Sequence, residues 1–261
     1  MENRTGAGVV IGTDLVAKGP RDGGMLLYTT VAHAATRALF PALPFDPEAD
    51  FAPVALVGRV PLLLLVHPAL PAADVPGLVA LLRANPGRYD YASPGIGSAV
   101  HLTTELFLRR AGGLAVNHIP FRAASVTLNE VIAGRVPIMF HVGTAALPQV
   151  RARQLRALAI SSAERSPLAP DIPTFAEQGL PGFTPSTWHM VLARAGTPAP
   201  LLATMNAAIH AAVAQPSVRG RLAALGMEPV ADSAPESAAA FLAAEIALWE
   251  GLVRGAGIRA E

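Results

Sequence analysis

Residues 89–101 read Tyr-Asp-Tyr-Ala-Ser-Pro-Gly-Ile-Gly-Ser-Ala-Val-His, and this segment is the most informative in the chain. It predicts a short strand that ends at Ser93, a glycine-containing loop, and an amphipathic helix that carries Leu102, Leu106 and Phe107. Short apolar runs alternate with amphipathic stretches in this way through most of the chain. Such alternation favours a parallel or mixed sheet flanked by helices, so the predicted fold class is α/β.

The predicted strands are short apolar segments, each edged by Gly, Pro or Ser. They are Met25–Thr29, Val54–Val57, Leu62–Val66, Tyr89–Ala92, Ala115–His118, Ile138–Val142, Leu155–Ile160 and Trp188–Leu192.

The last predicted helix has the clearest boundaries. Ser233-Ala-Pro-Glu236 fits a capping box, in which the serine hydroxyl accepts from a backbone amide and the glutamate reaches back. Gly255 is the predicted left-handed stop. Trp249 lies on the apolar stripe between them, which predicts that it belongs to the core.

Composition excludes several classes of protein. The 261 residues carry a formal net charge of +1 with scattered basic residues, so nucleic acid is not an expected partner. The absence of cysteine excludes disulfides, thiolate catalysis and cysteine-ligated metals. The densest apolar stretch, Val60–Val66, is far shorter than the ~20 residues of a membrane span. No charged-then-apolar leader precedes Glu2, so the chain as given is expected to carry no secretory signal.

The segment after Ser93 also predicts a site for an anion. Amides at the start of a helix attract negative charge, Gly95 and Gly97 let the backbone approach a ligand, and Ser93 and Ser98 add hydroxyl groups. A carboxylate would suit such a site. The alternative is that Ser98 merely caps the helix and the glycines form an ordinary turn.

Histidine and arginine side chains near the predicted strand ends are further candidates. His101, His118 and His141 could reach one cleft, or each could be structural and bonded to a backbone carbonyl. Arg122 could pair with an anion through its planar fork, or could be solvated at a helix start. No two histidines are spaced i, i+3 or i+4, so no metal site is predicted.

Enzyme signatures are weak in this sequence. The Gly6–Gly12 segment has one residue too many for a dinucleotide fingerprint and no room for a strand before it. No nucleotide or other cofactor is therefore expected. A hydrolase that uses Ser93 and His101, with Asp90 nearby, stays an alternative, although strand alternation points Asp90 and Ser93 in different directions.

Taken together, the motifs resemble the Bug family, the receptors of tripartite tricarboxylate transporters. The matching segments are Glu2–Gly8, Leu43–Asp46 with Asp50–Val54, Tyr91–Ser98 with His101-Leu102, His118–Arg122, Leu155–Ala159, Pro170–Thr174 and Ala195–Pro198. The resemblance covers the whole chain in the family's order.

This resemblance implies a type II periplasmic-binding-protein fold, with a carboxylate held in a cleft between two α/β lobes that close around it. The implied lobes are residues 1–66 with 187–261, and residues 67–186. The implied ligand-binding residues are Thr29, Thr30, His33, Ser93, Gly95, Gly97, Ser98, Ala99, His101, Phe121, Arg122 and His141. It also implies a monomeric periplasmic protein that has no catalytic activity and hands its solute to membrane permease subunits.

Two departures from the family pattern are expected to matter. Family members carry a leader, a strand and a Gly-Gly turn ahead of the motif at Glu2, so the chain resembles a member shortened at its N-terminus. His141 stands where relatives usually place an aspartate. Because a histidine removes a negative charge, we hypothesise a preference for a more anionic solute over an amino-bearing one.

Two alternatives from other classes remain. One is the hydrolase that uses Ser93 and His101, which would turn its substrate over. The other is the effector-sensing domain of a transcription regulator, which would need a helix-turn-helix ahead of residue 1.

Overall fold

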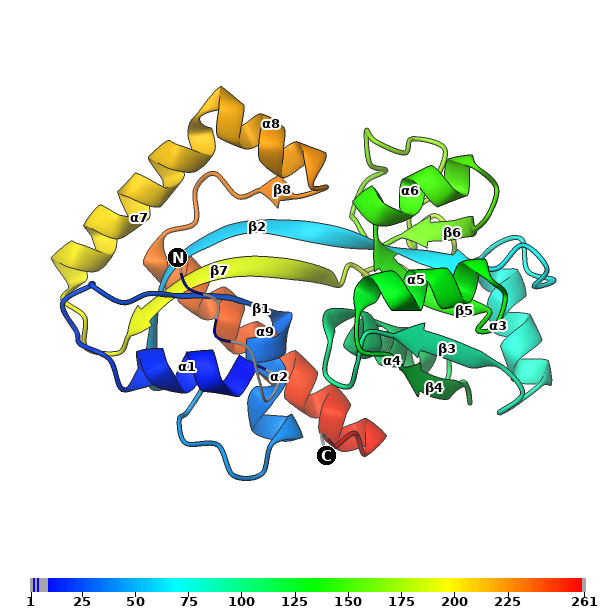
Figure 1. Cartoon of the computed structure of the whole chain (residues 1–261), viewed down its shortest axis with the longest axis horizontal. Coiled ribbons are helices and arrows are strands. Elements are labelled where there is room, and N and C mark those ends of the chain that lie inside the picture. The colour runs from blue at the N-terminus through cyan, green and yellow to red at the C-terminus, as the bar shows by residue number, and fades with distance from the viewer. Residues whose placement is uncertain (1, 3, 5–8, 260–261) are drawn as a thin grey trace. The chain divides into compact units, whose positions relative to one another are not determined.

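The chain forms a mixed α/β structure, seen in a computed structural model that describes residues 2, 4 and 9–259 (Figure 1). The helices are α1 (Val10–Ala17), α2 (Val31–Leu39), α3 (Val75–Ala84), α4 (Ala99–Arg110), α5 (Ala124–Ile132), α6 (Gly143–Arg151), α7 (Ala199–Ala214), α8 (Pro216–Ala224) and α9 (Pro235–Ala256). The strands are β1 (Leu27–Thr30), β2 (Phe51–Val66), β3 (Asp90–Ser93), β4 (Asn117–Pro120), β5 (Ile138–Val142), β6 (Arg156–Ile160), β7 (Ser186–Arg194) and β8 (Glu228–Pro229). The predicted α/β class is confirmed.

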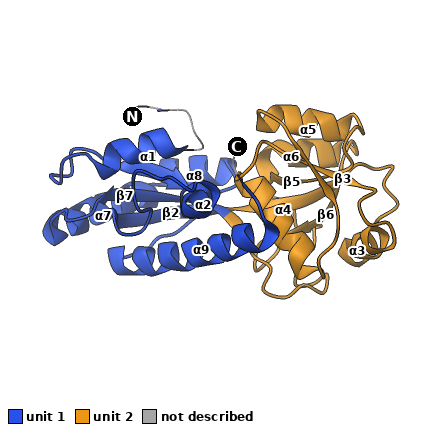
Figure 2. Cartoon of the chain, turned by 90° about the horizontal axis from the view of Figure 1, so that it is seen from below, with its two compact units in different colours: residues 1–59, 187–261 blue, residues 60–186 orange. Residues whose placement is uncertain are grey.

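Two compact units make up the chain (Figure 2). Unit 1 consists of residues 1–59 and 187–261, and unit 2 of residues 60–186. Strand β2 runs from one unit into the other. The units divide after Arg59, inside this strand, whereas the lobe boundary expected after Val66 lies at its end. Residues 3 and 5–8 lie outside the described residues. They belong to the motif at Glu2–Gly8 and, in part, to the Gly6–Gly12 segment.

Unit 2 contains a mixed sheet with the order β6-β2-β5-β3-β4. The second half of β2 lies between β5 and β6 and is antiparallel to both, with Leu64 opposite Phe140 and Ala159. Strand β3 is parallel to β4 and to β5. The carboxyl ends of β3, β4 and β5 therefore lie at one edge of this sheet, and α4, α5 and α6 begin there.

The core of unit 2 follows the two-residue period of its central strand. Leu62, Leu64 and Val66 pack on one face with the side chains of α3 and α4, whereas Leu63 and Leu65 pack on the other face with those of α5 and α6. None of the five has more than 1% of its surface exposed. Because helices cover both faces of the sheet, this segment is a continuous apolar run with no polar alternation.

Unit 1 contains β1, β7, the first half of β2, and β8, in that order. Strand β1 is antiparallel to β7, and β8 is antiparallel to β2 at Gly58 and Arg59. Helix α2 packs along α9. The predicted core position of Trp249 is confirmed, since its side chain is 1% exposed.

Two predicted strands, Val54–Val57 and Leu62–Val66, are in fact one strand of 16 residues. Pro61 lies inside it. Strand β8 pairs with β2 at Gly58 and Arg59, and β5 and β6 pair with it from Leu62 or Leu63 onward. Pro61 lies between these two pairings, so its missing amide hydrogen costs no bond to these three strands.

The predicted ends of the last helix were also wrong. Helix α9 begins at Pro235 after the N-cap residue Ala234, which makes no side-chain cap. The Ser233 hydroxyl instead accepts from the amide of Leu56 at 3.1 Å, so it ties α9 to β2. The helix continues through Gly255 and ends at Gly257, whose φ of 65° is the left-handed stop.

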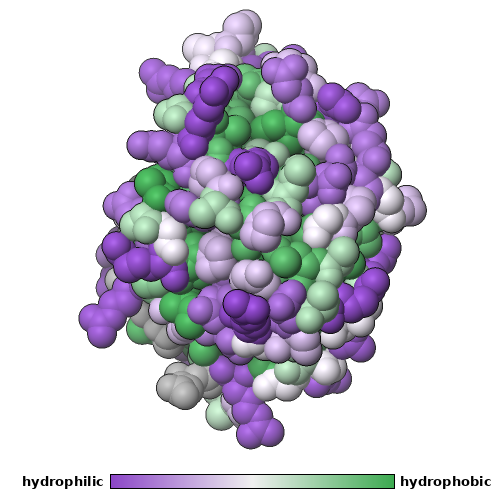
Figure 3. Space-filling model, turned by 90° about the vertical axis from the view of Figure 1, so that its right-hand side faces the viewer, coloured by the Kyte–Doolittle hydropathy of each residue, from purple (hydrophilic) through white to green (hydrophobic). Residues whose placement is uncertain are grey.

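On the face that Figure 3 shows, hydrophobic and hydrophilic side chains are interspersed. No helix within residues 9–259 is long and apolar enough to cross a membrane.

Candidate ligand-binding site

Three of the predicted segments meet at the edge of the unit 2 sheet where its parallel strands end. They are the loop Ser93–Ser98 after β3, Phe121 and Arg122 after β4, and His141 near the end of β5. The amide of Phe121 donates to the carbonyl of Ser93 at 2.8 Å, which joins the first two segments. In open α/β sheets, ligands bind outside the carboxyl ends of the strands.

The loop between β3 and α4 depends on two glycines. Gly95 and Gly97 have φ angles of 133° and 77°, which other residues rarely adopt. A side chain on Gly95 would also contact the carbonyl oxygen of Phe121, because its Cβ would lie 3.7 Å away. Ser98 then caps α4, since its hydroxyl donates to the carbonyl of Gly95 at 2.7 Å and accepts from the amide of His101 at 3.2 Å.

Several backbone amides of this loop are already bonded within it. The amide of Gly97 donates to Nδ1 of His101 at 3.1 Å, and that of Gly95 donates to the Ser93 hydroxyl at 3.2 Å. The amides of Ala99 and Val100, in the first turn of α4, have no acceptor among the described residues. These two amides are the donors that the helix start offers to an anion.

The two expected roles of Ser98 and the helix start therefore coexist. Ser98 does cap α4, yet the cap uses the amide of His101 and leaves those of Ala99 and Val100 without an acceptor in the described chain. Sequence reasoning named Ala99 and missed Val100. Once the helix start is placed at Ala99, the first two amides follow from helix geometry.

Three rings stack beneath the loop, those of Tyr91 and His101 buried and that of His118 half-buried. The ring centroids of His101 and His118 are 4.2 Å apart, and those of His118 and Tyr91 are 4.8 Å apart. Nε2 of His118 lies 2.6 Å from the hydroxyl oxygen of Ser93. Burial, together with the nearby His118, lowers the pKa of His101 to about 3, and burial lowers the pKa of His118 to about 4. Both imidazoles are therefore neutral near pH 7.

The alternative pairing of Ser93 with His101 does not occur in the structure. The serine hydroxyl bonds His118, and Nδ1 of His101 is occupied by the amide of Gly97. Among the described residues, no carboxylate bonds the ring of His118, and Ser93 has no exposed surface. A serine nucleophile needs both an oriented base and access to substrate.

Phe121 and Arg122 differ in exposure. Phe121 is half-buried and packs against the core beneath α5, whereas the Arg122 side chain is exposed. Arg122 has no ion pair or side-chain hydrogen bond among the described residues. Its guanidinium is therefore available to an anion at this edge.

His141 is buried at the end of β5. Its Nδ1 lies 3.1 Å from the carbonyl of Val142, and burial lowers the pKa of the imidazole. Its Nε2 is buried and has no hydrogen-bond partner among the described residues. The side chain is therefore neutral near pH 7.

The other three predicted residues belong to unit 1. Thr29 is buried and Thr30 is half-buried at the end of β1, where Thr30 is the N-cap residue of α2 without a side-chain cap. His33 is fully buried, and its Nε2 donates to the carbonyl of Pro47 at 2.8 Å. Whether these residues and those of unit 2 bind one ligand stays a prediction.

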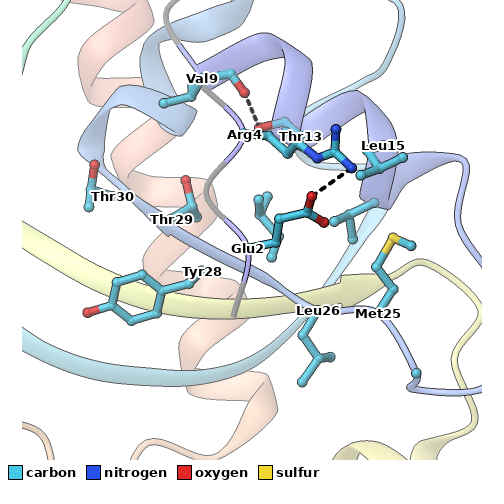
Figure 4. A pocket seen from close by; sticks show the side chains of 14 residues that line it. Glu2, Arg4, Val9, Thr13, Leu15, Met25, Leu26, Tyr28, Thr29 and Thr30 are labelled. Carbon is cyan, nitrogen blue, oxygen red and sulfur yellow. Dashed lines mark hydrogen bonds and ion pairs between the residues drawn. The ribbon is translucent and has the colours of Figure 1, made fainter. Parts of the chain in front are cut away.

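A cavity of about 640 Å³ in unit 1 has Thr29 and Thr30 in its lining (Figure 4). Its other described lining residues come from the N-terminal segment, α1, the loop before β1, and β1, and include the apolar side chains of Leu15 and Leu26. Arg4 in its wall forms an ion pair of 2.8 Å with Glu2. Because this charge is already neutralised, the described lining of the cavity offers no unpaired cation to a carboxylate.

Within the described residues, no group of three or more acidic or histidine side chains could hold a metal ion.

Comparison with solved structures defines the class of protein. A structure described as periplasmic binding protein BugD is 28% identical, with a TM-score of 0.82 over 99% of this chain and 87% of that chain. Rpa4515 of R. palustris, solved with adipate, is 33% identical, with a TM-score of 0.84 over 99% and 87%. MatC of Rhodopseudomonas palustris, solved with bound malate, is 33% identical, with a TM-score of 0.80 over 95% and 85%. The fold is that of these binding proteins.

The family follows from the sequence. A family model described as "Tripartite tricarboxylate transporter family receptor" matches residues 1–258. The chain belongs to this family. The resemblance to the Bug receptors and the type II periplasmic-binding-protein class are confirmed, while the individual ligand-binding residues stay predictions.

Proposed function

We propose that this chain captures a small dicarboxylate as the solute receptor of a tripartite tricarboxylate transporter. The observation that carries the proposal is the start of α4, where the amides of Ala99 and Val100 have no acceptor in the described chain. Amide hydrogens and the helix dipole attract a carboxylate at such a position. The similar proteins Rpa4515 and MatC were solved with adipate and malate, which are both dicarboxylates.

Arg122 is the proposed partner of the second carboxylate. It follows β4 at the same edge of the sheet as the start of α4, and its side chain is exposed. A guanidinium can bond both oxygens of a carboxylate at once. Neutral His141 adds no negative charge here, which supports the hypothesis that the site prefers a more anionic solute over an amino-bearing one.

Ser93, Gly95, Gly97, Ser98 and His101 shape the loop in this proposal, and Phe121 packs beside it. Thr29, Thr30 and His33 are the proposed contributions of unit 1.

The chain binds its solute without chemical change. Ser93 is buried against a histidine of low pKa, and no carboxylate bonds that histidine in the described chain, which argues against nucleophilic catalysis. The family and the comparison with BugD further support a periplasmic protein that delivers its solute to permease subunits. That the protein is a monomer is part of the proposal.

The test removes one amide hydrogen and leaves the helix in place. Ala99 is the first helical residue of α4, where proline is tolerated, and the φ and ψ of Ser98 (−65° and 155°) suit the residue before a proline. The matched control is Ala199→Pro at the first position of α7, where the φ and ψ of Pro198 are −57° and 135°. Calorimetric titration with malate, adipate and citrate measures the dissociation constants.

We expect Ala99→Pro to weaken dicarboxylate binding by about tenfold or more, because a hydrogen bond to a charged group contributes about 1.5–3 kcal/mol. Ala199→Pro should bind as the wild type does. No binding of any of these carboxylates by the wild type, or equal binding by wild type and Ala99→Pro, would contradict the proposed site. Equal affinity of wild type and His141→Asp for di- and tricarboxylates would refute the role of His141.

A further inference from the structure

The histidine of α4 holds one amide of the loop. His101 is 3% exposed, and its Nδ1 accepts from the amide of Gly97 at 3.1 Å. A ring nitrogen that accepts a hydrogen bond carries no proton, so the ring hydrogen of the neutral imidazole lies on Nε2. The side chain therefore acts on the loop through an acceptor and has little surface for a solute.

The histidine of β4 holds the other end of the loop. Nε2 of His118 lies 2.6 Å from the hydroxyl oxygen of Ser93. That oxygen also lies 3.2 Å from both the amide nitrogen and the carbonyl oxygen of Gly95. If the hydroxyl donates to this carbonyl, it accepts from Nε2–H of His118 and from the amide of Gly95.

Stacking fixes the planes of both rings. Tyr91 of β3, His118 of β4 and His101 of α4 stack with interplanar angles of 13° to 19°. The Tyr91 hydroxyl donates to Glu105 of α4. The column thus joins three elements, β3, β4 and α4.

We propose that His101 and His118 are positioning residues, which hold the loop Ser93–Ser98 so that the amides of Ala99 and Val100 stay available to the ligand. This inference rests on the proposed function. Neither imidazole contacts the solute. His101 satisfies the amide of Gly97, His118 fixes Ser93, and Ser98 can then cap α4 at the amide of His101 without occupying the two amides before it.

Side-chain variants can separate the acceptor from the volume of the ring. His101→Asn keeps an oxygen acceptor near the position of Nδ1, and His101→Leu removes it. His118→Gln keeps a donor near the position of Nε2, and His118→Leu removes it. The readouts are hydrogen exchange of the Gly95 and Gly97 amides by NMR and the dissociation constant for malate or adipate.

We expect His101→Leu to raise the exchange rate of the Gly97 amide by about tenfold and to weaken dicarboxylate binding by a similar factor. His101→Asn should restore both to within about threefold of the wild type. At the Gly95 amide, His118→Leu should raise the exchange rate and His118→Gln should restore it, with matching changes in the dissociation constant. A rescue of this kind distinguishes hydrogen-bond positioning from packing.

A measurement on the unmodified protein keeps the proposal testable if the leucine variants fail to fold. The ¹⁵N shift of His101 Nδ1 should be that of an unprotonated acceptor, with a scalar coupling across the hydrogen bond to the Gly97 amide. A protonated Nδ1 would overturn the proposal. So would leucine variants that bind and exchange as the wild type does. The wild type could fail to bind carboxylates while exchange of the Gly97 amide still rises in His101→Leu and recovers in His101→Asn. In that case the proposed function is wrong, but the role of the histidines in positioning the loop is supported.

Discussion

Acidification from pH 7 to pH 5 should destabilise unit 1 through His33. This side chain of α2 is fully buried, and its Nε2 donates to the carbonyl of Pro47. The ring of Phe51 in β2 packs edge-on against it, with 5.0 Å between the ring centroids. Burial lowers the pKa of His33 to about 4, although the bond to Pro47 acts in the opposite direction. In the unfolded chain the same imidazole titrates near 6.5.

The sign follows from proton binding. Between pH 6.5 and pH 4 the unfolded state holds a proton on this ring and the folded state does not, so the free energy of unfolding falls as the pH falls through this window. A pKa difference of about 2.5 units gives a loss of about 2 kcal/mol between pH 7 and pH 5.

The assay is urea unfolding at both pH values for wild type and His33→Gln. Glutamine can still donate to the carbonyl of Pro47 and does not titrate, so the variant lacks this contribution. The pH-dependent loss should be about 2 kcal/mol smaller in His33→Gln than in wild type. An equal loss in both proteins, or an NMR titration of His33 near 6.5, would show that the ring is accessible to water and refute the reasoning.

Substitutions at three positions give further expectations, each measured by urea unfolding. Ser98→Ala removes the cap of α4 and should cost about 1 kcal/mol. Glu245→Leu removes the carboxylate oxygen that accepts from the indole N–H of both Trp188 and Trp249 at 2.7 Å. This variant should lose about 2–4 kcal/mol of unfolding free energy and change the tryptophan fluorescence, whereas Glu245→Gln should lose less. Phe140→Ala empties a fully buried position in the aromatic cluster of unit 2 and should cost about 3–5 kcal/mol.

The fold could be predicted because its strands are short apolar runs between turn residues. Ile138–Val142 was predicted with the observed bounds. The errors occur where a local signal competes with a distant partner. The pattern Ser233–Glu236 satisfies a capping box, but the Ser233 hydroxyl accepts from Leu56, which is 177 positions earlier in the chain. No window of sequence around α9 contains that amide.

That several candidate residues meet at one edge of the sheet could be predicted, whereas the hydrogen bonds among them could not. Ser93, Arg122 and His141 were placed near the ends of strands, and pairing of those strands as parallel neighbours brings their ends to one edge. The bond between Ser93 and His118 joins β3 to β4 and depends on their register, in which Tyr91 faces His118. Sequence spacing alone does not reveal that register.

The start of α4 explains why the sequence pointed to an anion site, while it named only part of the donors that we propose for it. A loop with two glycines offers several amides, and the residues most open to a ligand in an isolated peptide would be Gly95 and Gly97. In the folded unit these two amides are used by Ser93 and His101. Among the described residues, the amides of Ile96, Ala99 and Val100 have no acceptor, and the side chains of the two helical residues, Ala99 and Val100, carry no chemical signal. A binding site made of backbone groups is therefore defined by which amides the protein itself does not use, and this is determined by the rings packed beneath the loop.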